Sequence, residues 1–119
     1  MTATTAALSL GDLGRLNDAA LEVILRHGVA RPSIDVELDL WRSLEEAYRR
    51  EQRTSKWLRL TGPRTSSRQE VLSALTAAAF QVALDSGTDE SELTALELDL
   101  LFAFQLVEVN EEARAVLAA

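Results

Sequence analysis

The residues best suited to contact a charged partner lie in a basic stretch between Arg42 and Arg68. Eight arginines and lysines occur there against three glutamates, with Tyr48 and Trp57 among them. Guanidinium groups beside aromatic rings bind carboxylates and phosphates, and they stack on nucleobases. The residues that we predict to bind a partner are Arg49, Arg50, Arg53, Trp57, Arg59 and Arg64. The alternative is a solvated helix face that pairs with acids of the same chain.

Carboxylates dominate the other end of the chain, where nine acids and no base lie between Asp85 and Glu112. Asp99 differs from the rest because Ala95, Ala103 and Leu106 share its side of the expected helix, an apolar setting for a carboxylate. Such an aspartate is a metal ligand, a partner for a buried arginine, or a group at the edge of a face that reaches water. Carboxylate oxygens that converge on one point bind magnesium or manganese.

Histidine and cysteine chemistry is restricted by composition. His27 is the only histidine and the chain has no cysteine, so a histidine- and cysteine-based zinc site cannot be built. No serine lies in a recognisable nucleophile motif, and His27 directly precedes Gly28. A histidine in the last turn interacts favourably with the negative end of its helix, and we interpret His27 in this way. We predict no cofactor and no metal.

Four helices must position these residues, and the apolar spacing predicts helices at about 10–27, 34–53, 67–86 and 89–109. Asn110 is a plausible stop, and residues 111–119 form either a short C-terminal helix or a continuation of the fourth. Ser67 and Glu70 form a capping box at the start of the third helix, and Gly28 and Gly87 follow the ends of the first and third. The sequence therefore predicts an all-α, four-helix bundle-like single domain over residues 9–119. Residues 1–8 are expected to fray.

Residues 34–41 fit two structures. Ile34, Val36, Leu38 and Leu40 alternate with acids, which is the period of a strand. No other segment resembles a partner strand, and a helical stripe continues from Leu38 into later residues. We therefore predict a helix. Residues 54–66 show no regular pattern, and they are the best candidate for a functional loop.

Two of the expected helices are unusually apolar. The helix at 67–86 is rich in alanine, so we expect it to lie at the centre of the bundle. The helix at 89–109 carries more leucine and phenylalanine than one face can hold. A helix of this kind is packed on two sides within the chain or contacts a second subunit. We predict a homodimer through helix 89–109.

Composition excludes several classes of protein. A hydrophobic content of 47% is too high for a disordered chain, and 119 residues suffice for one core. A net charge of −7 argues against a general nucleic-acid binder, because phosphate binding requires positive charge. The longest apolar runs are far shorter than a membrane span, and no signal peptide is evident. The absence of cysteine fits a cytoplasmic location.

One segment resembles a known family. Leu96-Glu97-Leu98-Asp99-Leu100-Leu101-Phe102 is similar to the Glu-x-x-Asp-Leu-Leu-Phe segment of the MazG-type all-α nucleotide pyrophosphohydrolases. The resemblance covers about the last 50 residues, and among the family's acidic residues only Asp99 carries over residue by residue. Leu96 stands in place of the family's glutamate, with Glu97 one position away, and the family's earlier glutamates have no counterpart in Leu72 to Ala79. The resemblance implies a degenerate enzyme.

We predict a non-enzymatic, small acidic regulatory protein of the adaptor, inhibitor, immunity or antitoxin type, which binds a protein partner. The alternative is the degenerate nucleotide hydrolase, which would use Asp99 and Glu97, with Glu70 as a further candidate, to bind magnesium or manganese. A third hypothesis is a nucleic-acid accessory protein that uses the basic segment 42–68. Charged surfaces of opposite sign favour the first, because complementary charge directs specific docking.

Overall fold

The described part of the chain forms four α-helices in the computed structural model. The structure describes residues 10–61 and 68–118, and the side-chain surroundings of residues 11–52, 69–110 and 116–117. The helices are α1 (Leu10–His27), α2 (Ser33–Thr61), α3 (Arg68–Asp85) and α4 (Leu93–Ala118), with a 3₁₀ turn, η1 (Glu90–Glu92), before α4. No strand occurs in the described ranges. The predicted all-α, bundle-like fold is therefore confirmed.

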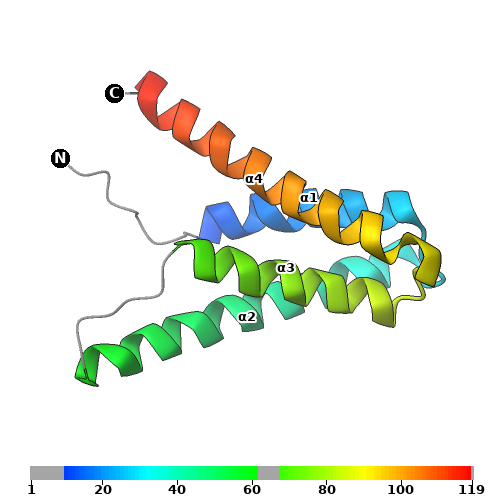
Figure 1. The fold of residues 1–119 in the computed structure, drawn as a ribbon, viewed down its shortest axis with the longest axis horizontal. Coiled ribbons are helices and arrows are strands. Elements are labelled where there is room, and N and C mark those ends of the chain that lie inside the picture. Colours follow the sequence, from blue (N-terminus) through cyan, green and yellow to red (C-terminus); the bar gives the residue numbers. More distant parts are fainter. Residues whose placement is uncertain (1–9, 62–67, 119) are drawn as a thin grey trace.

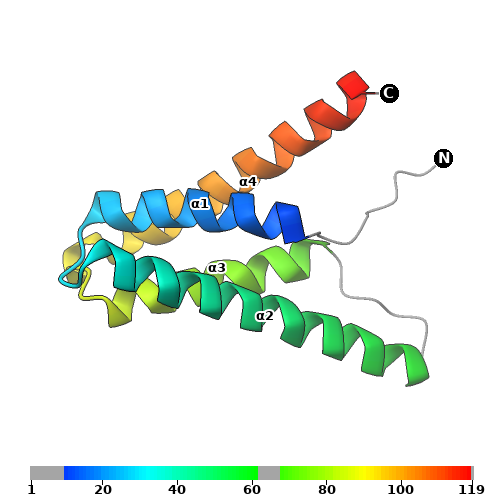
Figure 2. The same ribbon diagram turned by 180° about the vertical axis from the view of Figure 1, so that it is seen from behind.

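The helices form a ring in which each runs antiparallel to the one before it (Figure 1). The most extensive contacts join α2 to α3 and α1 to α4, and α4 thereby closes the ring (Figure 2). All four helices contribute to one apolar core. Its fully buried large side chains are Leu13, Leu16, Ile24, Val36, Leu40, Leu44, Leu75, Leu96 and Leu100. None of the helices in the described ranges is long and apolar enough to cross a membrane.

Residues 34–41 are helical, as we predicted, but α2 is longer than expected. Val36, Leu40 and Leu44 are buried, whereas the alternating partners Ile34 and Leu38 are each 58% exposed. The predicted end at Arg53 is wrong, since α2 continues to Thr61. No glycine or proline occurs between Ser33 and Thr61, so nothing in the backbone ends the helix earlier. The predicted loop 54–66 is thus partly helix, and its residues 62–66 lie outside the described ranges.

The expectation that helix 67–86 lies at the centre is wrong. In the structure α3 packs on α2 and α4 and occupies one corner of the ring. Ser73, Ala77 and Gln81 form its exposed side. Alanine favours helix whether it is buried or exposed, so a high alanine content does not show how many neighbours a helix has.

The two turns at one end of the bundle contact each other directly. Gly28 ends α1 with φ of 96°, and Gly87 follows α3 with φ of 90°. The Ala30 amide donates to the Ser86 carbonyl at 2.8 Å, and the Thr88 hydroxyl donates to the Gly28 carbonyl at 3.0 Å. These bonds join the α1–α2 turn to the α3–α4 turn, and they place the end of α1 beside the start of α4.

The last helix is continuous, so the predicted end at residue 109 and the separate short C-terminal helix are wrong, and the alternative of a continuation is the one observed. Asp89 caps η1 by accepting from the Ser91 amide at 2.9 Å, and α4 then runs unbroken to Ala118. Its inner side is buried at Leu96, Leu100 and Phe104. Its C-terminal part diverges from the other helices (Figures 1 and 2). Asn110 lies within α4 and does not end it, because asparagine lowers helix propensity only modestly.

Candidate protein-interaction surface

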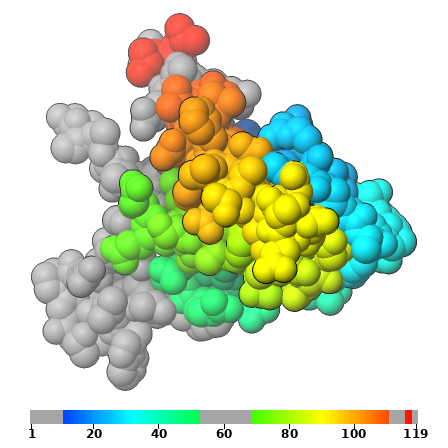
Figure 3. Space-filling view, turned by 45° about the vertical axis from the view of Figure 1, so that its right-hand side comes forward, coloured from blue at the N-terminus to red at the C-terminus, as the bar shows by residue number. Residues whose placement is uncertain are grey.

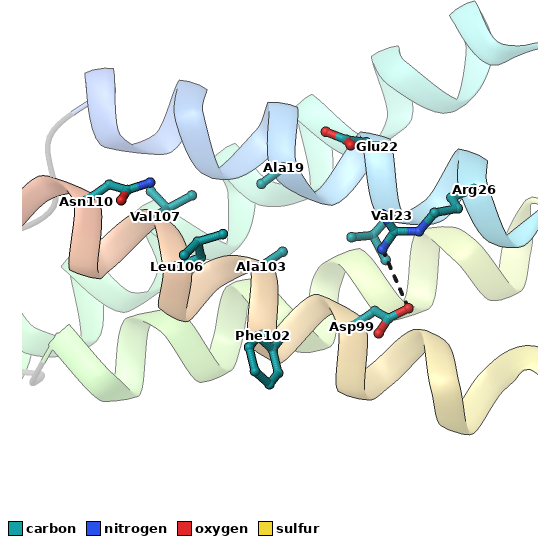
Figure 4. Close-up of a pocket in the computed structure, with 10 residues that line it drawn as sticks. All are labelled: Ala19, Glu22, Val23, Arg26, Asp99, Phe102, Ala103, Leu106, Val107 and Asn110. Carbon is teal, nitrogen blue, oxygen red and sulfur yellow. Dashed lines mark ion pairs between the residues drawn. The ribbon is translucent and has the colours of Figure 1, made fainter.

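The end of α1 is tied to α4 by a polar cluster that we call the His27 cluster, made of Arg26, His27, Glu92 and Asp99. In the protonated imidazole of His27, Nδ1 donates to Glu92 Oε1 at 2.8 Å and Nε2 donates to Asp99 Oδ2 at 2.6 Å. Arg26 lies on the outer side, with its guanidinium 3.6 Å from Asp99 Oδ2 (Figure 4). Only 9% of the His27 side chain is exposed. The cluster therefore fixes the first turns of α4 against α1.

Electrostatics in this cluster favour the charged forms of its members. The hydrogen bonds to Asp99 and Glu92, reinforced by their negative charges, raise the pKa of His27 above its ordinary value of 6.5. The hydrogen bond from His27 lowers the pKa of Asp99 below its ordinary value of 3.8, and the nearby charges of His27 and Arg26 act in the same direction. Imidazolium and carboxylate thus stabilise each other, as expected for a structural ion pair.

This geometry changes the roles that the sequence suggested for His27 and Asp99. A general base needs a free ring nitrogen, and both nitrogens of His27 already contact carboxylates. Asp99 is the partner of a histidine and an arginine of its own chain. Sequence analysis placed His27 correctly at the end of a helix but missed its carboxylate partners. They lie 65 and 72 residues away, and no local pattern connects them.

The carboxylates of the enzyme alternative do not converge. Asp99 lines a groove between α1 and α4, whereas Glu97 lines a different groove between α3 and α4. Glu70 lies in the first turn of α3, which is at the opposite end of the antiparallel α3–α4 pair from Asp99. A divalent cation bound by several carboxylates needs their oxygens around a single point. The described positions of these three residues do not provide one.

The predicted basic surface is only partly within the described side chains. Arg49 and Arg50 are exposed and lie 3.5 Å and 3.4 Å from Glu45 and Glu46, one turn earlier on α2. Arg53, Trp57 and Arg59 belong to the C-terminal part of α2, where only the helix itself is described. Arg64 lies outside the described residues. Partner binding by this set therefore stays a prediction.

The most unusual surface is the outer side of α4. Four large apolar residues lie there at spacings of four, four and three, and we call them the α4 ridge. They are Leu98, Phe102, Leu106 and Val109, with exposed fractions of 59, 74, 58 and 58%. Leu101 beside them is 40% exposed. Continuous exposed apolar surface of this kind is uncommon on a monomer, and it marks sites where proteins bind each other.

Two grooves flank the α4 ridge. One, of about 350 Å³, lies between α1 and α4 and includes Ala19, Val23, Ala103 and Val107 in its lining (Figure 4). The other, of about 420 Å³, lies between α3 and α4 and includes Ala77 and Phe80. In the space-filling view α4 lies at the front, with α1 on one side and α3 on the other (Figure 3). The surface thus offers both projecting side chains and concave sites for them.

Comparison with known proteins gives no further guidance. No family of known proteins, no curated protein and no solved structure matches this chain. Its function must therefore be inferred from the chemistry of its own surface.

Proposed function

We propose that this chain is a non-enzymatic interaction protein, of the adaptor, inhibitor, immunity or antitoxin type, that binds another protein molecule through the α4 ridge. The α4 ridge itself is the observation that supports the proposal. Burying apolar surface stabilises a complex by about 25 cal/mol per Å² before the costs of association are subtracted. In the described chain no other helix covers Leu98, Phe102 or Leu106.

The arrangement of polar groups around the α4 ridge supports the same proposal. Protein interfaces combine an apolar centre with a polar rim, and aromatic residues often anchor the centre. Phe102 is the aromatic residue of the ridge, and it is also the ridge residue with the largest exposed fraction. Glu22 and Arg26 on α1 and Glu97 on α4 lie around the ridge, where solvent reaches them. These charges would contribute orientation and specificity rather than most of the affinity.

The basic part of α2 is a second surface within the same proposal. Arg49 and Arg50 are exposed, and Arg53, Trp57 and Arg59 follow on the same helix. An acidic protein partner would complement this charge. A cytoplasmic location, suggested by the absence of cysteine, belongs to the proposal as well.

The test is site-specific photo-crosslinking in living cells. A benzophenone amino acid replaces Leu106 in one variant and Leu38 in the other. These two leucines are matched, since each is 58% exposed, but Leu38 lies on α2 away from the α4 ridge. We expect an adduct of defined mass from position 106 and none from position 38. Mass spectrometry then shows whether the captured protein is this chain or another. Absence of an adduct at 106, or equal capture at both positions, would contradict the proposal.

A further inference from the structure

The imidazole of His27 needs two protons to make both of its contacts. Its Nδ1 lies 2.8 Å from Glu92 Oε1, and its Nε2 lies 2.6 Å from Asp99 Oδ2. An ionised carboxylate only accepts hydrogen bonds, so both ring nitrogens must donate. A neutral imidazole has a single N–H, and its other nitrogen would present a lone pair to a carboxylate. Loss of one proton from His27 therefore breaks one of the two contacts.

Asp99 is the more firmly placed of the two carboxylates. The nearby Leu96 and Leu100 are fully buried, and they hold this part of α4 in the core. The guanidinium of Arg26 lies 3.6 Å from the same Asp99 oxygen that binds His27, so this carboxylate has a second cation beside it. Asp99 therefore keeps its position beside Nε2 when the ring loses its charge.

Glu92 is held less firmly. It belongs to η1, a three-residue 3₁₀ turn that contains no buried residue. In the described part of the chain, its carboxylate forms an ion pair with His27 and with no other residue. Its side chain is 46% exposed, so water can replace the lost hydrogen bond. Glu92 is therefore the carboxylate that leaves when His27 becomes neutral.

The other charged groups around this end of the bundle are engaged elsewhere or open to solvent. Arg31 pairs with Asp39 of α2 at 2.6 Å. The remaining groups are Glu22 on α1, Asp85 on α3, which accepts from Gln81, Asp89, which accepts from Ser91, Glu90 on η1 and Glu97, which lines the groove between α3 and α4. The hydrogen bonds and charges that favour the charged ring come from Asp99 and Glu92.

The direction of the pH response follows from these contacts. The hydrogen bonds to Asp99 and to Glu92 raise the pKa of His27 above its ordinary value of 6.5, although partial burial opposes them. The imidazolium with both contacts is thus the form present at pH 6.5 and below. The contact with Glu92 is lost as pH rises through the folded pKa, and it returns when pH falls.

We propose that the proton of His27 controls the order of η1. The imidazolium holds η1 to the end of α1 through Glu92, whereas the neutral ring keeps its one N–H on Nε2 for Asp99 and releases Glu92. The Thr88 hydroxyl still donates to the Gly28 carbonyl, and α1 still packs on α4. The turn η1 thus becomes mobile while the bundle stays folded. This inference is independent of the proposed function, because it requires no partner.

NMR spectroscopy of the ring tests which carboxylate keeps the proton. His27 is the only histidine, so long-range proton–nitrogen spectra contain the signals of a single imidazole. As pH is raised until the ring is neutral, we expect the proton to leave Nδ1 and to stay on Nε2. Asp99→Asn should reverse this result, because Glu92 is then the one carboxylate that attracts the remaining proton. A proton left on Nδ1 in the wild-type chain, or the same tautomer in both chains, would overturn the inference.

Backbone nitrogen relaxation tests whether η1 responds. The order parameters of the Ser91 and Glu92 amides should fall from about 0.85, typical of rigid backbone, toward about 0.6 as the ring becomes neutral, whereas that of Ile24 in α1 should not change. Glu92→Gln should abolish this pH dependence, because a glutamine amide can accept from the charged ring and donate to the neutral one.

Glu97→Gln is the matched control, since it removes a carboxylate of α4 that lines the groove on the α3 side. Its η1 should respond to pH like that of the wild-type chain. Order at η1 that does not change during the titration, or an equal loss of the response in Glu97→Gln, would contradict the proposal. Circular dichroism that shows loss of the helices before the ring is neutral would contradict it as well.

Discussion

The two sides of the N-terminal half of α4 differ in whether their side chains have partners within the chain. On the side that faces α1, Glu92 of η1 and Asp99 of α4 are charged groups whose partners come from α1 of the same chain. Along the outer side, Leu98 and Phe102 are apolar groups to which the described chain offers no cover. Leu98 and Asp99 are adjacent in sequence, yet one is left to solvent and the other is paired. The chain thus pairs these charged groups internally and leaves its surplus apolar surface exposed.

The largest expected effect contrasts the inner and outer sides of α4. Leu100→Ala should reduce the free energy of unfolding by about 2–5 kcal/mol, because Leu100 is fully buried and its truncation leaves a cavity. Leu98→Ala should cost less than about 1 kcal/mol, since the side chain is already 59% exposed. Urea denaturation of both variants in the Leu106→Glu background measures the difference without a contribution from association. Equal losses would show that Leu98 is part of the core.

A smaller effect is expected where the two turns meet. Gly87→Ala should cost about 2 kcal/mol or more, because an L-residue at positive φ is strained by about 1–2 kcal/mol and the new Cβ would lie 2.8 Å from Ala30 Cβ. Gly28→Ala meets no atom within 4 Å at a similar φ, so it should show only the conformational cost of about 1 kcal/mol. The difference between their thermal midpoints measures the contact between the turns. Identical midpoints would mean that the turns separate easily.

The His27 cluster should make stability depend on pH. Its raised pKa means that His27 stabilises the folded state fully below its unfolded pKa, near 6.5, and loses this contribution as pH rises through the higher folded pKa. Asp99, with its lowered pKa, loses its contribution as pH falls below about 3.8 through the folded value. Urea midpoints should therefore decrease between pH 6 and pH 9 in Leu106→Glu. Adding His27→Gln should flatten this decrease, and a decrease of unchanged size would assign it to other groups.

The smallest expected effect concerns the exposed ion pairs on α2. Arg50→Ala should change the free energy of unfolding by less than about 0.5 kcal/mol, because both Arg50 and Glu46 are more than half exposed. Any larger effect of this substitution should appear in partner binding and not in folding. Loss of partner capture together with an unchanged free energy of unfolding would support the predicted basic surface. A large loss of stability would instead give Arg50 a structural role.

Helix boundaries could be predicted from the sequence where a glycine directly follows an apolar stripe. The first helix was predicted at 10–27, and α1 spans Leu10–His27, because Gly28 ends the helix directly after its apolar stripe. The end of α2 was missed because neither glycine nor proline interrupts the chain before Gly62. The surplus of apolar residues on α4 could be counted in advance. Which of them stay exposed could not, because this depends on where α1 and α3 pack.

The sequence by itself determined the helical class, the glycine turns and the excess of leucine and phenylalanine on the last helix, since all of these follow from residue type and spacing. Tertiary structure alone brought His27 to Glu92 and Asp99, because this contact requires the end of α1 and the start of α4 to lie at the same end of the ring. That Glu97 and Asp99 point to different sides already follows from their spacing of two on a helix, and tertiary structure decided only that Glu97 faces α3 and Asp99 faces α1. Local sequence specifies the helices, and only their packing decides which side chains meet.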